Sequence, residues 1–185
     1  MKIRQLLKIT SRTSSVTNGF VQAIIPSIEP THSEIVEALQ ILGMTVDARS
    51  CIYCGMAATD WDHLRPLVQH KRPTGYIHEI RNLVPSCGPC NQSKSGANWE
   101  AWMNSDARGS PRSKGVSDLE QRIDRLRRFV EWGNVKPLPL SELAGVEQWN
   151  AHWANLHTIL QKMQEAQQHA VLVREAIHRA LKVRK

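Results

Sequence analysis

Two short cysteine pairs decide how this sequence can fold: Cys51-Ile52-Tyr53-Cys54 and Cys87-Gly88-Pro89-Cys90. In a C-x-x-C pair, one tight turn lets two thiolates converge, and two pairs supply the four sulfur ligands of a tetrahedral zinc site. Because four thiolates leave no open coordination position, the expected metal is structural. The sequence therefore predicts a small zinc-clamped core over residues 49–104.

The residues between and after the pairs indicate two strands and a helix. Asp62 and His63 lie in a short strand-like stretch, where neighbouring side chains point to opposite faces. The stretch 82–86 also reads as extended and leads directly into the second pair. Pro89 suits the first turn of a helix, on which Asn91 and Lys94 would be three residues apart on one face.

This pattern resembles the HNH endonucleases, or ββα-metal nucleases, in the subgroup clamped by a four-cysteine zinc. The resemblance covers about a quarter of the chain and lies within residues 49–104. It is carried by Cys51-x-x-Cys54, Asp62-His63-Leu64-x-Pro66, Asn82-Leu83-x-Pro85 and Cys87-x-x-Cys90-Asn91-x-x-Lys94. Asn91 replaces the final histidine of the family motif and still offers an oxygen ligand.

The resemblance implies a role for each matching residue. His63 would be the general base that activates water, and Asp62 and Asn91 would hold a catalytic magnesium or manganese ion. Asn82 would brace the loop between the strands. Lys94 and Arg65 would hold a phosphate, and the basic residues of the intervening loop would contact DNA: Lys71, Arg72 and Arg81. The implied reaction is hydrolysis of a DNA phosphodiester to 5′-phosphate and 3′-hydroxyl ends.

The flanks carry their own local signals. Asn18-Gly19 before an apolar run predicts a hairpin within residues 1–48, and Thr31-His32-Ser33-Glu34 is a capping box that predicts a helix ending near Gly43. Residues 105–116 are rich in Ser, Gly, Pro and Arg, which is typical of a linker or a mobile basic loop. Residues 117–185 read as helical, with a second capping box at 117–120. The predicted fold class is therefore α+β, a ββα-metal core flanked by a hairpin-helix segment and a helical region.

The C-terminal helix has a heptad-like apolar seam that must be buried against something. Nine of eleven seam positions are apolar, from Val146 to Leu181. The sequence alone leaves two candidates for the surface that covers this seam. The seam could pack on the chain's own helix at 118–132, or it could form a homodimer.

Composition limits the remaining choices. The chain has 185 residues, with 24 basic and 17 acidic side chains and a formal charge of +7, which favours a polyanionic partner such as double-stranded DNA. No apolar run reaches the roughly 18 residues of a membrane span, and no secretion signal is evident, so we expect an intracellular protein. In that compartment thiols stay reduced, which favours metal ligation over disulfides.

Three functional hypotheses follow from the sequence. The first is a metal-dependent, restriction-type DNA endonuclease, or one of the similar homing or phage nicking enzymes. The second is a non-catalytic zinc-ribbon module that only binds nucleic acid. The third, suggested by the seam, is a structural partner in a larger assembly.

Overall fold

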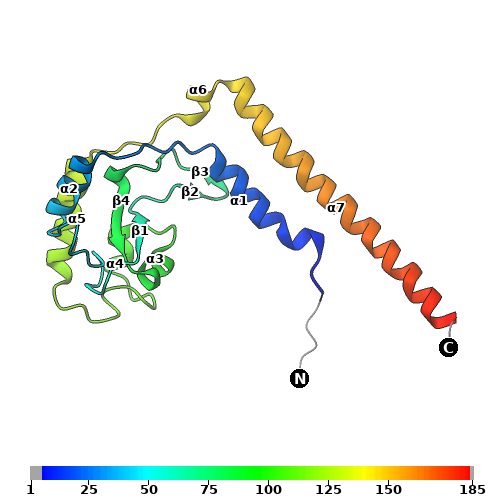
Figure 1. Cartoon of the computed structure of the whole chain (residues 1–185), viewed down its shortest axis with the longest axis horizontal. Helices are drawn as coiled ribbons and strands as arrows, with labels where there is room; N and C mark the ends of the chain where they lie inside the picture. Colours follow the sequence, from blue (N-terminus) through cyan, green and yellow to red (C-terminus); the bar gives the residue numbers. More distant parts are fainter. Residues whose placement is uncertain (1–5, 184–185) are drawn as a thin grey trace. The chain divides into compact units, whose positions relative to one another are not determined.

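The computed structural model describes residues 6–183 and divides them into two compact units (Figure 1). One unit combines both ends of the described chain, up to Ala23 and from Leu140 onward. The other unit is Ile24–Pro139 and contains all four cysteines. This division differs from the predicted one, because the predicted core of residues 49–104 is extended on both sides by helices that pack on it.

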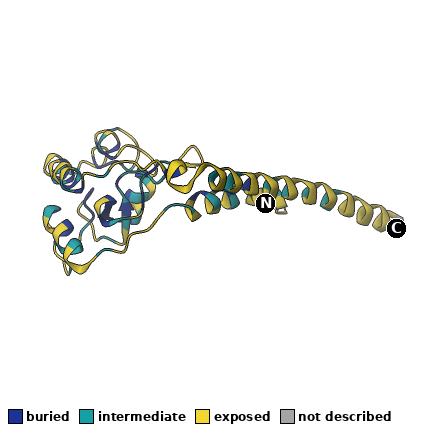
Figure 2. Cartoon of the chain, turned by 90° about the horizontal axis from the view of Figure 1, so that it is seen from above, coloured by how far each residue is buried: buried dark blue, intermediate teal, exposed yellow. Residues whose placement is uncertain are grey.

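The cysteine-containing unit is built around a two-stranded antiparallel sheet. Strand β1 (Asp60–His63) pairs with β4 (Leu83–Ser86), so that Asp62 lies opposite Val84 and His63 opposite Leu83. Helix α3 (Gly88–Lys94) follows β4 after one residue and packs on β1. Figure 2 shows buried residues concentrated around these elements. The strand–strand–helix order is the one that the sequence predicted.

A second, very short hairpin projects from the loop between β1 and β4. It joins β2 (Val68–Gln69) to β3 (Arg72–Pro73), and a 3-10 helix, η2 (Ile80–Asn82), then leads into β4. His70 and Lys71 form the turn with φ values of 49° and 60°. Positive φ at both central residues is the geometry of a type I′ turn, which suits the twist of a hairpin. The turn exposes Lys71 and Arg72.

Three further helices complete this unit. Helix α2 (His32–Ile41) begins with the predicted capping box, which is confirmed: the Thr31 hydroxyl accepts from the Glu34 amide and the Glu34 carboxylate accepts from the Thr31 amide. Helix α4 (Trp99–Met103) follows α3, and α5 (Leu119–Gly133) buries Ile123, Leu126 and Phe129 in the common core.

Residues 105–116 do not form a free linker. Ser110 is fully buried, and its hydroxyl donates to the Ser105 carbonyl at 2.6 Å. The Ser93 hydroxyl donates to the Arg108 carbonyl, which ties this segment to α3.

The second predicted capping box, at residues 117–120, does not form. Asp118 is the N-cap of α5, and its carboxylate accepts from Arg122 Nε at 2.8 Å instead.

The other unit is entirely helical. It contains η1 (Ile9–Arg12), α1 (Thr13–Ala23), α6 (Leu140–Ala144) and the long α7 (Val146–Val183). The predicted hairpin at Asn18-Gly19 is wrong, because both residues lie inside α1. Helix α1 packs on α7, burying Val21, and His152 bonds the Phe20 carbonyl at 3.0 Å. This long-range packing outweighs the roughly 1 kcal/mol helix penalty of glycine.

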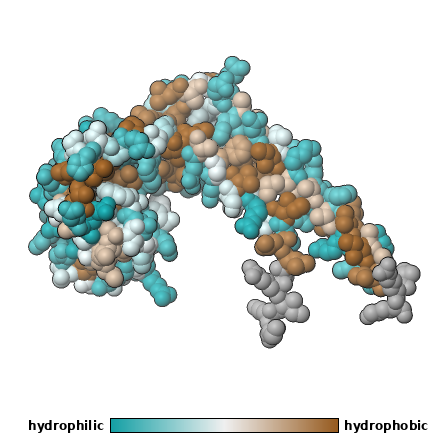
Figure 3. Space-filling view, viewed as in Figure 1, coloured by the Kyte–Doolittle hydropathy of each residue, from teal (hydrophilic) through white to brown (hydrophobic). Residues whose placement is uncertain are grey.

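The seam of α7 is covered over only part of its length. From Trp149 to Val171, partly or fully buried residues recur at the spacing of one helix face, against α1 and η1. Beyond this stretch four large apolar side chains are exposed: Leu172, Val173, Ile177 and Leu181. Figure 3 shows apolar surface along the C-terminal part of this helix. Across residues 6–183, no helix combines the length and apolar character that membrane crossing requires.

Candidate metal centre and adjacent polar site

The four cysteines converge as predicted. The Sγ atoms of Cys51, Cys54, Cys87 and Cys90 all lie within 4.8 Å of one another. The Cys54 and Cys87 sulfurs are 3.7 Å apart. A tetrahedral site with Zn–S bonds of about 2.3 Å has sulfurs separated by about 3.8 Å. The cluster therefore fits a four-thiolate zinc ion, and the four side chains could hold such a metal.

Two cationic side chains from outside the cysteine pairs support this cluster. Lys114 Nζ lies 3.4 Å from Cys90 Sγ, where its charge offsets the excess negative charge of four thiolates. Arg122 Nη1 donates to the carbonyls of Cys51 and Ile52, at 3.2 and 3.1 Å. Gly55 has φ +81°, and a Cβ there would come within 2.7 Å of Arg122 Nη2, so this turn requires glycine.

The thiols differ in their readiness to ionise. Hydrogen bonding, chiefly from Cys90, lowers the pKa of Cys51 to about 5 despite burial. The same hydrogen bond raises the pKa of Cys90, and burial raises the pKa of Cys54. Cys51 is therefore better prepared than Cys54 or Cys90 to receive a cation at neutral pH, and binding must displace the protons of those two thiols.

Asp62 is fixed in a buried polar network next to this cluster. Its Oδ2 accepts from the Tyr53 hydroxyl at 2.6 Å and lies 3.3 Å from Lys94 Nζ. Burial raises the pKa of the Asp62 carboxyl, and the nearby Lys94 opposes this effect. Burial likewise lowers the pKa of Lys94. Because both contacts fall on Oδ2, any cation bound by Asp62 would use Oδ1.

Lys94 lies inside the protein and not on a solvent-facing surface. The residue is 1% exposed, and Nζ also donates to the carbonyls of His63 and Ser95, at 3.0 and 3.2 Å. The amine thus joins α3 to β1. In this arrangement Lys94 supports the strand that carries Asp62 and His63, and it does not occupy the exposed position expected of a phosphate contact.

We expect Lys94→Met to destabilise the protein by about 3–5 kcal/mol, because methionine fills the same space but leaves Asp62 buried without its cation. Urea unfolding would measure the change. Lys162→Met is the matched control, since Lys162 pairs with Glu165 in an ion pair whose two side chains are 71% and 46% exposed. That change should cost less than about 1 kcal/mol. Equal effects for the two variants would contradict the buried bridge.

His63 extends from the same strand but has different neighbours. Its Nε2 lies 2.9 Å from Nδ1 of His78, and the two rings meet edge to face. Burial, followed by the proximity of His78 and Lys94, lowers the pKa of His63 to about 4. His63 is therefore neutral at pH 7 and has a lone pair available to accept a proton.

The backbone holds His78 in place. Its amide donates to the Pro26 carbonyl at 3.0 Å, and its carbonyl accepts from the Ile28 amide at 2.9 Å. These bonds come from the segment that precedes α2, far away in the sequence. His78 is thus the acceptor or donor that orients the His63 ring.

The two asparagines have different surroundings. Asn82 is fully buried, and its side chain bonds both backbone groups of Arg65: Oδ1 accepts from the amide at 2.9 Å and Nδ2 donates to the carbonyl at 3.0 Å. It braces the chain directly after β1. Asn91 is half-buried on α3, one residue beyond Cys90. Its amide oxygen is a ligand type that magnesium accepts.

The basic residues proposed to contact DNA are not equivalent. Lys71, Arg72 and Arg81 are exposed, and the Arg81 guanidinium lies over the Trp132 ring at 5.4 Å. Arg65 is half-buried, with its guanidinium 5.5 Å from the centre of the Tyr76 ring. The first three side chains are therefore more accessible to solvent than that of Arg65.

Sequence reasoning did not place at this site four residues that the structure brings there: Tyr53, His78, Lys114 and Arg122. Tyr53 lies between the predicted ligands Cys51 and Cys54, so its place in the sequence already indicated that it lies close to the metal site. The other three reach the site through contacts more than 14 residues away in sequence. No local pattern marks such contacts.

The chain was compared with protein-family models, with curated proteins and with solved structures, and none of the three comparisons found a match.

Proposed function

We propose that this protein is a metal-dependent DNA endonuclease. The observation that carries the proposal is the packing of α3 on β1, which joins the helix bearing Asn91 to the strand bearing Asp62 and His63. Beside it lies a cysteine cluster suited to a structural zinc. A module that only binds nucleic acid would need neither a neutral, oriented imidazole nor oxygen ligands on the same strand and the adjoining helix.

In the proposed reaction, water attacks the phosphorus and His63 takes the proton that the water loses. In one tautomer, Nε2–H of His63 donates to His78 Nδ1, and the lone pair on Nδ1 of His63 is then the base. The bond to the 3′ oxygen breaks and this oxygen takes up a proton from solvent, leaving 5′-phosphate and 3′-hydroxyl ends. Lys94 holds the His63 carbonyl and therefore the position of the base.

Asp62, through Oδ1, and Asn91 would hold the catalytic magnesium or manganese ion. Such an ion supplies positive charge at the phosphate oxygens. One carboxylate and one amide oxygen form a hard, oxygen-only donor set, which favours these ions over zinc. The exposed Lys71, Arg72 and Arg81 would contact the backbone of double-stranded DNA.

The proposal is tested by incubating supercoiled plasmid with the zinc-loaded protein, with and without added magnesium or manganese. We expect cleavage only with the added ion, and products that DNA ligase rejoins without prior phosphorylation. Sequencing the ends would give the cut position on each strand. Failure to cleave with either ion would overturn the proposal, and ends bearing 3′-phosphate would overturn the mechanism.

The rate of cleavage should change little with acidity between pH 8 and pH 5. A histidine with the ordinary pKa of about 6.5 is only about 3% neutral at pH 5, so it would lose about 30-fold in rate. With its pKa lowered to about 4, His63 stays mostly neutral at pH 5, and the loss should be less than about twofold. Single-turnover rates, with the melting temperature recorded at each pH, would check this. A 30-fold decline without unfolding would contradict it.

His78→Leu should lower the cleavage rate by about 2- to 12-fold, the equivalent of one neutral hydrogen bond. His78→Asn retains a hydrogen-bonding atom near the position of Nδ1 and should restore part of the rate. The comparison is made at saturating DNA, so that binding does not enter. Equal rates for the two variants would show that His78 does not orient the base.

A further inference from the structure

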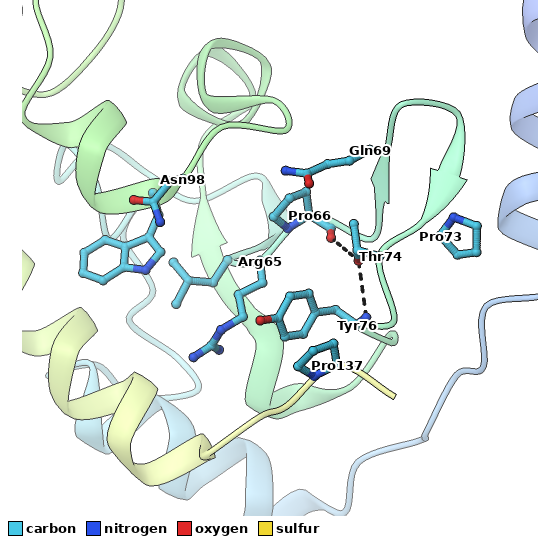
Figure 4. A pocket seen from close by; sticks show the side chains of 10 residues that line it. Arg65, Pro66, Gln69, Pro73, Thr74, Tyr76, Asn98 and Pro137 are labelled. Atoms are coloured by element: carbon cyan, nitrogen blue, oxygen red, sulfur yellow. Dashed lines mark hydrogen bonds between the residues drawn. The ribbon is translucent and has the colours of Figure 1, made fainter. Parts of the chain in front are cut away.

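A cavity of about 460 Å³ opens beside the end of β1, within the cysteine-containing unit. Arg65 and Tyr76 lie side by side in it, with Pro137 next to the Tyr76 ring (Figure 4). Gln69 and Asn98 contribute amide groups to the wall. A volume of this size can hold a nucleotide-sized group.

The guanidinium of Arg65 is not fully satisfied in its present position. Its Nη1 is buried and has no hydrogen-bond partner among the described residues. A buried donor without an acceptor is unfavourable, so rotation towards an acceptor in the cavity would be favoured. Asn82 meanwhile fixes the Arg65 backbone through two hydrogen bonds. The arginine therefore has a rigid base and an unpaired donor at its tip.

The walls suit a nucleobase better than a phosphate. Half of the lining residues are aromatic or proline residues, and Arg65 is the cationic side chain among them all. A phosphate would lose much of its hydration there for a single cation. A nucleobase instead offers flat faces to the rings and in-plane acceptors to Arg65, and its edge can bond the amides of Gln69 and Asn98.

The cavity is also close to the proposed chemistry. Arg65 follows His63 by two residues, so their Cα atoms are within about 7 Å. A base bound by Arg65 would belong to a nucleotide next to the bond being cut. In a duplex that base must leave the stack to enter a cavity.

We propose that this cavity receives one unstacked nucleobase of the DNA strand, from a nucleotide adjacent to the scissile phosphate, with an acceptor of the base on Arg65. This inference rests on the proposed endonuclease function and specifies how its substrate is held. It gives Arg65 a base contact in place of the phosphate contact that the sequence suggested.

The test pairs a protein change with a substrate change. Duplexes that span a mapped cut site are prepared intact or with an abasic nucleotide at each position near the cut. On intact DNA we expect Arg65→Met to lower kcat/KM by about 10- to 150-fold, as for a lost hydrogen bond to a charged group. On the duplex lacking the bound base, wild type and Arg65→Met should cleave at equal rates. Arg128→Met, which removes an exposed charge from α5, should not distinguish the two substrates.

The outcomes separate the possible explanations. If Arg65→Met is equally impaired on every abasic duplex, Arg65 contacts the backbone and the proposal is overturned. If millimolar deoxynucleoside monophosphates protect wild type but not Arg65→Met from thermal unfolding, while abasic positions have no effect, the cavity binds a free nucleotide and the proposal is also overturned.

Photocross-linking provides a readout that does not depend on cleavage. 5-Iodo-deoxyuridine is placed at each position near the cut and irradiated with the full-length protein. A cross-link to Tyr76 from one position supports the cavity even if no DNA is cut, in which case only the endonuclease proposal fails. Cleavage accompanied by cross-links confined to residues outside the cavity would overturn the inference.

Discussion

Replacing Cys87 with serine is expected to abolish zinc binding and unfold the unit Ile24–Pro139. Structural zinc binds with an apparent free energy of about 10–16 kcal/mol at neutral pH, whereas an ordinary domain is stable by about 5–15 kcal/mol. The cysteines lie among the buried residues to which α2, α4 and α5 contribute, so loss of the metal should loosen the whole core. Circular dichroism melting and metal analysis of the purified protein would measure both effects.

The matched control for this variant is Met56→Ser. Met56 follows the first cysteine pair but is 69% exposed, so the same new residue type there should change neither zinc content nor melting temperature. The expected wild-type content is one zinc per chain. If Cys87→Ser retained that zinc and melted at the wild-type temperature, the four-thiolate site would be wrong.

His63→Ala is expected to lower the rate of DNA cleavage by about 100- to 10,000-fold, which is the usual contribution of a general base. The variant should keep its zinc and its melting temperature, because His63 is only half-buried and is not among the cysteine ligands. Cleavage of supercoiled plasmid in magnesium would measure the rate. His157→Ala removes an exposed histidine from α7 and should cleave at the wild-type rate.

This comparison also separates the endonuclease from the zinc-ribbon alternative. Equal cleavage by His63→Ala and wild type would remove His63 from the chemistry. If neither protein cleaved but both bound DNA with equal affinity, the binding module would become the better description. A large loss of rate with unchanged DNA affinity is the result that the proposed mechanism requires.

The parts of the site that the sequence predicted correctly depend on local patterns. The two C-x-x-C pairs, the short strands around Asp62 and Leu83 and the helix start at Pro89 are each encoded within a few residues. The capping box at Thr31 is local in the same way. For such features, residue spacing specifies the geometry before any tertiary contact forms.

The features that sequence reasoning missed depend on distant contacts. Asn18-Gly19 favours a hairpin locally, but packing of α1 on α7, more than 100 residues away, places both residues in a helix. The resemblance implies that Lys94 holds a phosphate, yet the buried Asp62 carboxylate and the His63 carbonyl hold its amine inside the protein. The motif could not specify that the anionic partner of Lys94 is a side chain of the protein itself.

The helical unit joins α1 to α7 across more than 100 intervening residues, and this has a consequence for the order in which the protein matures. During synthesis α1 emerges well before its partner α7. At about 5–20 residues per second, the intervening unit Ile24–Pro139 alone requires about 6–23 s. The cysteine-containing unit therefore begins to leave the ribosome ahead of α7, and it can start to capture its metal while α1 still lacks its helical partner.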